Sequence, residues 1–462
     1  MRNLTWMTLV LASLMAFGCD DGAVDPDGGM DLPDTGMDPD TGTMMDPDTG
    51  VMMGDGNDTF ADADPLEDPM TMGAIAQPGD LDYYSFTGTA GQWVIIETNA
   101  NPDDDPEMID TVITLYDESM TQIAENDDSQ PRVNTDSEII TQLPADGTYY
   151  ILVQEFTTWA GETAEGQADF TYELSFGGLN FDAEVVTGDA ESGDDAASAN
   201  ALGFAMDTMG MASDFGIVAG DFRDGSDVDV FSFSITPGRF SLTAQLMPVG
   251  TDGNGATVTP AAIWITNADG SQIIARVDPS MLESVNPPLP EGDYLLWVEH
   301  GGAASSADFY VMKLFRGRID NPPETMEATN GVAATPEPLS FEAIMDVPGA
   351  ERAFIGATVG DGDTDFYSLE VTDASEVVSI FCGSRTAGSG VVDLQAALTD
   401  STGTTVIEMA TETATDGIAI QEASVSAAGT YLLRLTKGSQ DAEVTGNWAR
   451  CGVVVGPPAP TP

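Results

Sequence analysis

The chain has 462 residues, enough for two to four domains, and carries 78 Asp and Glu against 13 Lys and Arg, a formal net charge of −65. Such a charge repels phosphate backbones and anionic head groups, so we expect no binding to nucleic acid. Hydrophobic residues make up 42% of the chain, which is compatible with folded cores. One histidine and three cysteines leave little material for metal or nucleophilic catalysis, and we expect that the protein is not an enzyme.

Residues 1–18 have the pattern of an export signal. Arg2 precedes an apolar stretch at 6–17 that is shorter than the roughly 20 residues of a membrane-spanning helix. The Ala-Phe-Gly before Cys19 resembles the lipobox of bacterial lipoproteins, which implies cleavage there and lipid on Cys19; an ordinary secretory signal is the alternative. We therefore expect an exported protein held to a membrane by its N-terminal lipid, at the outer membrane or cell surface. Asp20 leaves inner-membrane retention open.

The composition of residues 19–57 predicts a disordered acidic tether. From Asp20 to Asp58 there are twelve aspartates and no Lys or Arg, and Met-Asp-Pro-Asp-Thr-Gly occurs at 37–42 and again at 45–50. Pro, Gly and like-charge repulsion all oppose collapse. Asp-Thr-Gly is also a signature of aspartic proteases, but those enzymes need two such loops between buried strands so that the carboxylates converge. We favour the tether.

Two sequence elements occur three times after the tether. The first is an acidic turn that leads into a strand, and the second is a Gly turn that leads into an aromatic and aliphatic strand. The distance from the second Asp of the first element to the Gly of the second is 65, 63 and 64 residues (82→147, 229→292, 365→429). This equal spacing indicates three copies of one structural unit.

Short segments rich in β-branched and aromatic residues, separated by Gly, Asp and Asn turns, lie between these landmarks, and no segment has the pattern of an amphipathic helix. We therefore predict an all-β protein of three tandem antiparallel β-sandwiches after the disordered linker. The predicted domains are 58–180, 190–316 and 320–456, followed by a tail at 457–462. The predicted strands include 93–97, 111–116, 170–176, 262–266, 309–315, 377–381, 394–398 and 447–455.

The first unit resembles the bacterial pre-peptidase C-terminal domain. The resemblance rests on Asp82-Tyr-Tyr-Ser-Phe, on Leu-Tyr-Asp at 115–117, on Asn-Asp-Asp at 126–128 and on Gly147-Thr-Tyr. The second and third units keep both ends of this pattern but diverge in the middle. The resemblance implies jelly-roll-like β-sandwiches, which are usually appended to secreted proteases and other extracellular enzymes. Relatives of this family include collagen-binding modules, some of which bind Ca²⁺. No catalytic domain precedes the repeats in this sequence.

Each acidic turn offers two aspartates that are candidate Ca²⁺ ligands. Alternate side chains of a strand share a face, so the two carboxylates could converge with a turn carbonyl on one ion. The alternative, which we favour, is that these side chains accept hydrogen bonds from backbone amides of the turn. A further acidic group, formed by residues 103–105 and Asp110, is a weaker candidate that we expect to be a solvated loop. The candidate ligand pairs are Asp80 and Asp82, Asp227 and Asp229, and Asp363 and Asp365.

Cys382 and Cys451 lie in the third unit, 69 residues apart, and in an exported protein they predict a disulfide; two buried thiols are the alternative. His300 has no serine elbow or metal-ligand partner in the sequence, so we expect a surface histidine. Trp159 and Trp448 stand near strand ends, where they could be exposed to contact a polymer; packing against a neighbouring unit is the alternative that we favour.

These features favour a lipid-anchored, non-catalytic exported protein whose sandwiches bind or adhere to an extracellular polymer, either protein or polysaccharide, with Ca²⁺ as a candidate cofactor. An accessory or secretion module associated with a secreted peptidase is the alternative. A hydrolase that uses paired carboxylates would need them at a defined separation across a cleft, and nothing in the sequence requires that arrangement. The acidity also fits a saline habitat, in which the aspartates only keep the surface hydrated.

Overall fold

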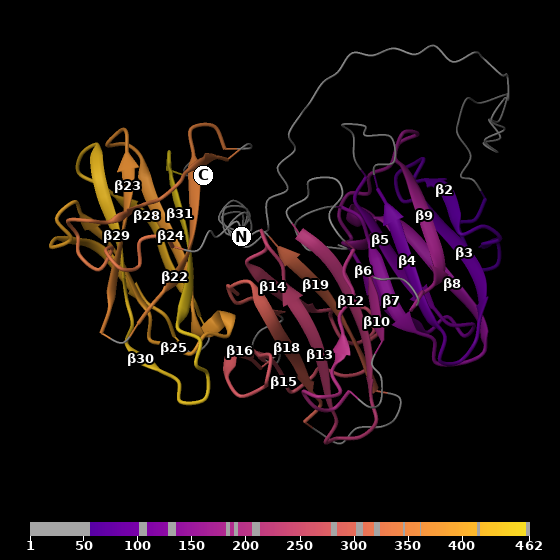
Figure 1. The fold of residues 1–462 in the computed structure, drawn as a ribbon. Coiled ribbons are helices and arrows are strands. Elements are labelled where there is room, and N and C mark those ends of the chain that lie inside the picture. Colours follow the sequence, from indigo (N-terminus) through magenta and orange to yellow (C-terminus); the bar gives the residue numbers. More distant parts are fainter. Residues whose placement is uncertain are drawn as a thin grey trace, which may run out of the picture. The chain divides into compact units, whose positions relative to one another are not determined.

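A computed structural model gives the fold of the protein (Figure 1). Its described residues are mainly β-strand, with one short α-helix, α2 (Phe156–Trp159), and one 3-10 helix, η1 (Arg385–Ala387). The predicted all-β fold is confirmed. Cys19, the export signal and nearly all of the tether lie outside the described residues. These are 56–100, 109–127, 135–181, 185–188, 193–205, 213–278, 284–301, 308–317, 324–344, 347–360, 362–413 and 416–458.

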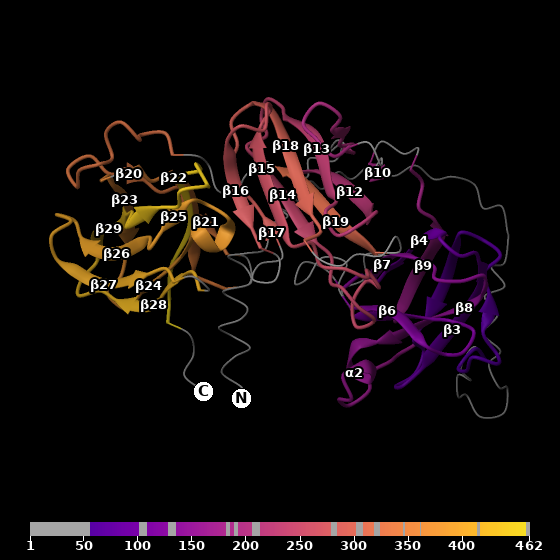
Figure 2. The same cartoon turned by 90° about the horizontal axis from the view of Figure 1, so that it is seen from below.

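The first sandwich consists of a five-stranded and a four-stranded sheet (Figure 1, Figure 2). The five-stranded sheet has the order β1-β3-β8-β5-β6, and the other sheet has the order β2-β9-β4-β7. Apart from the parallel pair β1 and β3, neighbouring strands are antiparallel. The strands are β1 (Asp64–Pro65), β2 (Met70–Ala74), β3 (Leu81–Gly88), β4 (Trp93–Asn99), β5 (Thr111–Tyr116), β6 (Gln122–Asn126), β7 (Glu138–Gln142), β8 (Gly147–Glu155) and β9 (Thr171–Gly178).

The second sandwich repeats this strand order and adds β10 at the edge of its second sheet. Its sheets are β11-β13-β18-β15-β16 and β10-β12-β19-β14-β17. The strands are β10 (Val186–Gly188), β11 (Asn200–Ala201), β12 (Ser213–Phe222), β13 (Val228–Ile235), β14 (Ser241–Leu246), β15 (Ala262–Asn267), β16 (Ile273–Val277), β17 (Ser284–Val285), β18 (Gly292–Glu299) and β19 (Asp308–Gly317).

The third sandwich has the same order again, in sheets β20-β23-β29-β26-β27 and β21-β22-β31-β24-β28, and β25 and β30 form an additional small ladder. The strands are β20 (Glu337–Pro338), β21 (Glu342–Ala343), β22 (Glu351–Thr358), β23 (Thr364–Val371), β24 (Val377–Gly383), β25 (Val391–Val392), β26 (Gln395–Asp400), β27 (Val406–Thr411), β28 (Ile418–Ser424), β29 (Gly429–Thr436), β30 (Ser439–Gln440) and β31 (Trp448–Gly456).

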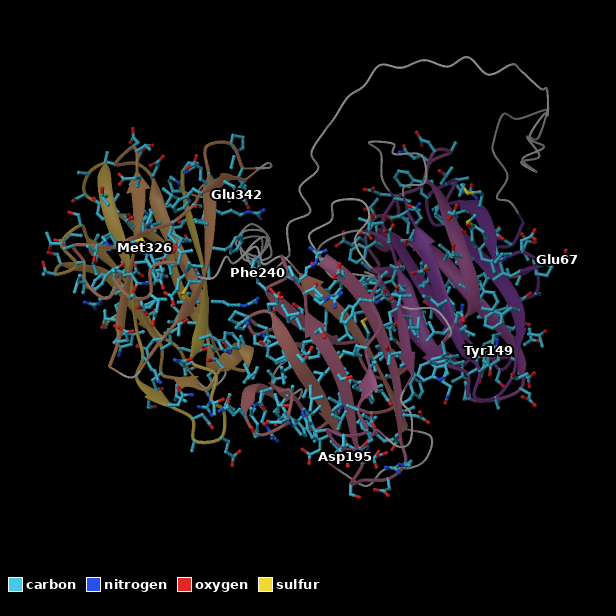
Figure 3. All side chains as sticks on the ribbon, viewed as in Figure 1. Glu67, Tyr149, Asp195, Phe240, Met326 and Glu342 are labelled. Atoms are coloured by element: carbon cyan, nitrogen blue, oxygen red, sulfur yellow. A yellow bond between two sulfur atoms is a disulfide. The ribbon has the colours of Figure 1, made fainter. Side chains whose placement is uncertain are left out.

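Each sandwich encloses its own apolar core, and alternation along the strands decides which side chains enter it. The end of β13 shows this alternation: Phe233 and Ile235 are buried, and Ser234 between them is exposed. Tyr149 of β8 fills the first core and is 1% exposed (Figure 3). The aromatic residues of the repeated motifs are therefore mainly core residues.

Cys382 of β24 and Cys451 of β31 form the predicted disulfide, which is thus confirmed. The two residues are direct partners in the ladder between these strands, and both are buried. The bond therefore joins neighbouring strands of one sheet in the third sandwich.

The described residues group into two compact units. One unit holds the first sandwich together with the loop Pro248–Thr257, and the other holds the remaining parts of the second and third sandwiches. No helix in the described ranges has the length and apolarity that crossing a bilayer requires.

Candidate metal centre

The second aspartate of each repeated pair occupies the same place in its sandwich. Asp82, Asp229 and Asp365 are the second residues of β3, β13 and β23, and each is at most 1% exposed. A carboxylate buried at this depth needs a hydrogen-bond donor or a cation, because an unpaired buried charge is costly. The first two repeats meet this need in the same way, and the third does not.

In the first two sandwiches a tyrosine from the facing sheet donates its hydroxyl to the buried aspartate. Tyr172 of β9 donates to Asp82 Oδ2, and Tyr310 of β19 donates to Asp229 Oδ2 over 2.7 Å. Glycine makes room for the tyrosine ring: Gly220 pairs with Tyr310, and a Cβ on this glycine would lie 2.4 Å from the Tyr310 Cζ.

The first aspartate of each of these two pairs is bound within its turn. Asp80 Oδ2 accepts the Ala76 amide at 2.8 Å, and Asp227 accepts the Arg223 amide at 2.7 Å. The Arg223 guanidinium also binds Asp227 at 2.7 Å and reaches Asp194. Burial opposes ionisation of Asp227, but the hydrogen bonds and charge of Arg223 outweigh it and lower the pKa. Hydrogen bonding to turn amides, the favoured interpretation of these residues, is therefore observed in both turns.

The third sandwich lacks the tyrosine. Its equivalent on β31 is Arg450, which pairs with Gly356 of β22. Neither oxygen of the Asp365 carboxylate has a hydrogen-bond partner among the described residues, although the side chain is fully buried. Asp363 accepts only the neighbouring amide of Thr364, at 2.9 Å, among the hydrogen bonds of the described residues. Among the three equivalent aspartates, Asp365 is thus the one without a hydrogen-bond donor for its buried carboxylate in the described part of the chain.

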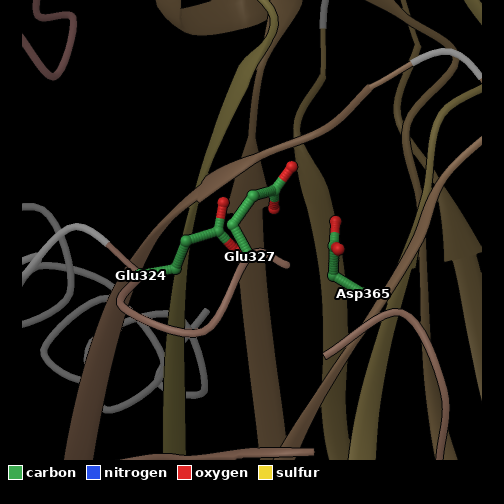
Figure 4. A group of neighbouring side chains, drawn as sticks. All are labelled: Glu324, Glu327 and Asp365. Atoms are coloured by element: carbon green, nitrogen blue, oxygen red, sulfur yellow. The ribbon is translucent and has the colours of Figure 1, made fainter. Parts of the chain in front are cut away.

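Two glutamates reach this carboxylate from the segment that leads into the third sandwich (Figure 4). Glu324, Glu327 and Asp365 each place one carboxylate oxygen within 4.8 Å of the others. Glu324 Oε2 is positioned by two donors: the Tyr367 hydroxyl at 2.6 Å and the Asn330 Nδ2 at 3.0 Å. The Asn330 Oδ1 has no partner, and this side chain is also fully buried.

The environment of the cluster raises the pKa of Asp365 and of Glu327. Burial, followed by the charges of Glu324, Asp363 and Glu327, raises the pKa of Asp365 to about 8. Desolvation and the hydrogen bond and charge of Glu324 raise the pKa of Glu327 to about 7. Burial and the Glu324 carboxylate raise the pKa of the Tyr367 hydroxyl as well. The cluster is therefore short of positive charge, and a cation would stabilise it.

The donor set suits a hard divalent cation. Ca²⁺ takes six to eight oxygen ligands from carboxylates, amide carbonyls and water, in flexible geometry. Three carboxylates supply such oxygens, the Asn330 amide lies beside them on Glu324, and the cluster contains no nitrogen or sulfur ligand that would favour a transition metal. An amide can also turn to present its oxygen, because the two ends of the Asn side chain are nearly isosteric. These residues fit Ca²⁺.

The other candidate residues are not part of this cluster. Residues 103–105 and Cys19 lie outside the described residues, and Asn126 Oδ1 accepts the Glu138 amide at 3.0 Å as a structural contact. His300 is only 6% exposed and packs edge-on against Phe222, so the prediction of a surface histidine is wrong.

The two tryptophans near strand ends differ in exposure. Trp159 is 40% exposed, whereas Trp448 is 5% exposed because it packs into the core of the second sandwich, which is the favoured packing against a neighbouring unit. The end of a strand is therefore a poor guide to exposure where two sandwiches of one compact unit meet.

The sequence interpretation missed Glu324, Glu327 and Asn330. A signal for Asn330 exists: its carbonyl accepts the amide of Phe366, as the carbonyl of Asn57 accepts that of Tyr83. Alignment of the segments that precede the first and third acidic turns would therefore have pointed to this asparagine; Gly193 takes its place in the second repeat.

Comparison with known proteins identifies the first repeat. Residues 80–155 match the family model of the bacterial pre-peptidase C-terminal domain. A probable subtilase-type serine protease of Deinococcus radiodurans is 38% identical over 100 residues, which are 21% of this chain and only 13% of that protein.

Similarity to solved structures is weak over the whole chain. The pre-peptidase C-terminal domain of Bacillus anthracis collagenase aligns with 25% of this chain and 94% of its own, at 19% identity and a TM-score of 0.19. Tandem CBM51 modules of a family 98 glycoside hydrolase from Streptococcus pneumoniae align with 53% of this chain and 84% of their own, at 11% identity and a TM-score of 0.18. The family match thus establishes that the first sandwich contains a bacterial pre-peptidase C-terminal domain.

Proposed function

We propose that this protein is an exported, non-catalytic binding protein whose β-sandwiches attach to an extracellular polymer, protein or polysaccharide, and whose third sandwich holds Ca²⁺. The observation that carries the cation is the buried Asp365 carboxylate without a partner, which faces Glu324 and Glu327. A pre-peptidase C-terminal domain and a disulfide support an extracellular location. Lipid on Cys19 as the membrane anchor is part of the same proposal.

The ion would join two separate parts of the third sandwich. Glu324 and Glu327 belong to the segment that enters this sandwich, whereas Asp365 lies on β23. A cation shared by these carboxylates would fix the entering segment against the sheet and lower its mobility. A stiffer entry to the last sandwich suits a protein that holds a polymer at a distance from a membrane.

Ca²⁺ is expected to raise the melting temperature of the full chain relative to the same protein in chelator. At about 100 times the dissociation constant, the gain in free energy of unfolding is about 2.7 kcal/mol. Asp365→Asn is expected to abolish the shift, because it removes the central ligand. Asp229→Asn, the same change in the second sandwich, is expected to keep it. Calorimetry of the three proteins with and without Ca²⁺ provides the measurement.

A Ca²⁺ shift of equal size in Asp365→Asn, or no shift in the unmodified chain, would remove the cation from the proposal. The comparison is made between each variant with Ca²⁺ and the same variant in chelator. Any change that a substitution makes to the metal-free protein therefore cancels.

Polymer binding is tested by co-sedimentation of the full chain with insoluble collagen, cell-wall material and polysaccharides, in Ca²⁺ and in chelator. We expect retention on at least one of these polymers and less retention in chelator. Retention on none of them would contradict polymer binding.

An accessory role beside a secreted peptidase is the second candidate. It is favoured by the match to a probable subtilase-type protease, which is confined to a small part of that protein. Stable co-purification with a peptidase, together with failure to bind any polymer, would support this role instead.

A further inference from the structure

One edge strand occupies the same position in all three sandwiches. β6, β16 and β27 each end the five-stranded sheet and pair with β5, β15 and β26. Each pair has its register shift at the same place, between Leu115 and Tyr116, between Ile265 and Thr266, and between Leu398 and Thr399. By this register Glu125, Arg276 and Met409 are equivalent residues of the three edges.

Chain segments cover this edge in the first two cases. The Glu125 amide donates to the Gly253 carbonyl at 2.9 Å, and Gln122 Nε2 donates to the Thr251 carbonyl at 2.8 Å. The loop that supplies these carbonyls, Pro248–Thr257, belongs to the compact unit of the first sandwich.

The second edge is covered in the same manner by loops of the third sandwich. The Arg276 amide donates to the Gly388 carbonyl at 2.9 Å, and the Thr445 amide donates to the Ile273 carbonyl at 2.7 Å. The same outward N–H therefore finds a glycine carbonyl on both edges.

The third edge, β27, has no such cover among the described residues. Val406, Ile407 and Met409 are 44%, 36% and 51% exposed, and the hydrogen bonds of the described residues include no acceptor for the outward amide of Met409. The strand contains one charged residue, Glu408, and neither Lys nor Pro, which are the residues that usually protect an edge from pairing. β27 is therefore an apolar edge with an unused row of backbone groups.

We propose that β27 is the docking edge for a second copy of this chain, which pairs with it antiparallel through its own β27. Loops form hydrogen bonds with the equivalent edge strands β6 and β16 of the two preceding sandwiches. This repeated pattern indicates that β27 also has a hydrogen-bonding partner. Pairing centred on Met409 places Met409 opposite its own copy, Ile407 opposite Thr411, and Glu408 opposite Ala410. The one carboxylate of the strand thus avoids its copy, and the outward amide and carbonyl of Met409 bond reciprocally.

Loop docking by a second copy fits the edge less well. The sequence between β4 and β5, residues 100–110, contains no glycine and five carboxylates, whereas glycine supplies the carbonyl on both covered edges. Symmetric pairing of two β27 strands also closes into a dimer, which is the commonest form of self-association.

Sedimentation velocity of the full chain over a concentration series tests the proposal. We expect a monomer–dimer equilibrium that shifts toward the dimer when salt is raised from about 0.15 M to about 1 M, because the net charge of −65 opposes association until it is screened. Met409→Lys is expected to weaken dimerisation at least about tenfold, because it sets two like charges directly opposite each other. Met70→Lys is the matched control, since Met70 is 56% exposed on β2 of the first sandwich, and it should dimerise as the unmodified chain does.

Met409→Pro gives an independent variant. Proline is tolerated at an edge position whose N–H faces outward, so the sheet should persist while the reciprocal bond is lost. A chain that stays monomeric at every concentration and salt, or a dimer that survives both Met409 substitutions, would overturn the proposal.

Discussion

Removal of the disulfide is expected to lower the free energy of unfolding of the third sandwich by about 4 kcal/mol. Cys382 and Cys451 are 69 residues apart, and the bond between them closes a loop that restricts the unfolded chain. Both residues are buried, so the double substitution Cys382→Ala with Cys451→Ala also leaves a small cavity. The third sandwich should therefore unfold well before the other two.

Hydrogen exchange of the amides of β24 and β31 measures this loss in the full chain. Reduction of the unmodified protein should accelerate the same amides, whereas the reductant should have no effect on the double variant. Amides of β4 and β9 in the first sandwich serve as the internal control, because no cysteine lies in those strands. Unchanged exchange in β24 and β31 after removal of the bond would show that the ladder alone determines the stability of this sandwich.

The sequence predicts the strands well because repetition and alternation are local signals. Thr111–Tyr116 is predicted to the residue, and the predicted last strand at 447–455 is observed as Trp448–Gly456. β22, at Glu351–Thr358, was not predicted. It carries Gly356 and charged residues where a strand pattern expects β-branched ones, and its place in the sheet follows from pairing with β31.

The candidate site is predictable only in part, because its character depends on register between distant strands. The repeated motif identifies Asp365 but makes it equivalent to Asp82 and Asp229. What distinguishes it is the residue at the ladder position that the tyrosine holds in the first two repeats, which is Arg450 in the third. That difference is found only when β31 is aligned with β9 and β19 by the glycine with which each of these residues pairs in the neighbouring strand.

The glutamates were missed for a related reason. Glu324 and Glu327 lie about 40 residues before Asp365, in a segment without strand periodicity, and the fold of that segment brings them to β23. Local pattern contains no information on such a contact.

Asp365→Asn is expected to stabilise the third sandwich at neutral and alkaline pH when no divalent cation is present. The unfolded chain loses this carboxyl proton near pH 3.8, whereas the folded cluster holds it up to about pH 8. Between those values the folded state binds more protons than the unfolded state, so the free energy of unfolding falls as the pH rises. The difference between the two pKa values corresponds to at most about 6 kcal/mol.

Asparagine cannot ionise, so the variant should lose most of this dependence while keeping the shape of the side chain. Glu327, whose pKa is raised to about 7, shares the cluster, and the remaining slope in the variant should be smaller because one buried negative charge has gone. Below about pH 4 the variant and the unmodified protein should be equally stable, because Asp365 is then protonated in both states.

Hydrogen exchange of β23 and β29 amides, in chelator across this pH range, yields the free energy of unfolding after correction for the intrinsic exchange rate. The unmodified chain and Asp365→Asn should diverge progressively above pH 4, and Ca²⁺ should restore the unmodified chain while leaving the variant unchanged. Asp229→Asn is the control, since that carboxylate belongs to another sandwich and is bound by Tyr310. If Asp365→Asn and Asp229→Asn gave the same dependence of the free energy of unfolding on pH in β23, the buried charge that destabilises the metal-free third sandwich would not be that of Asp365.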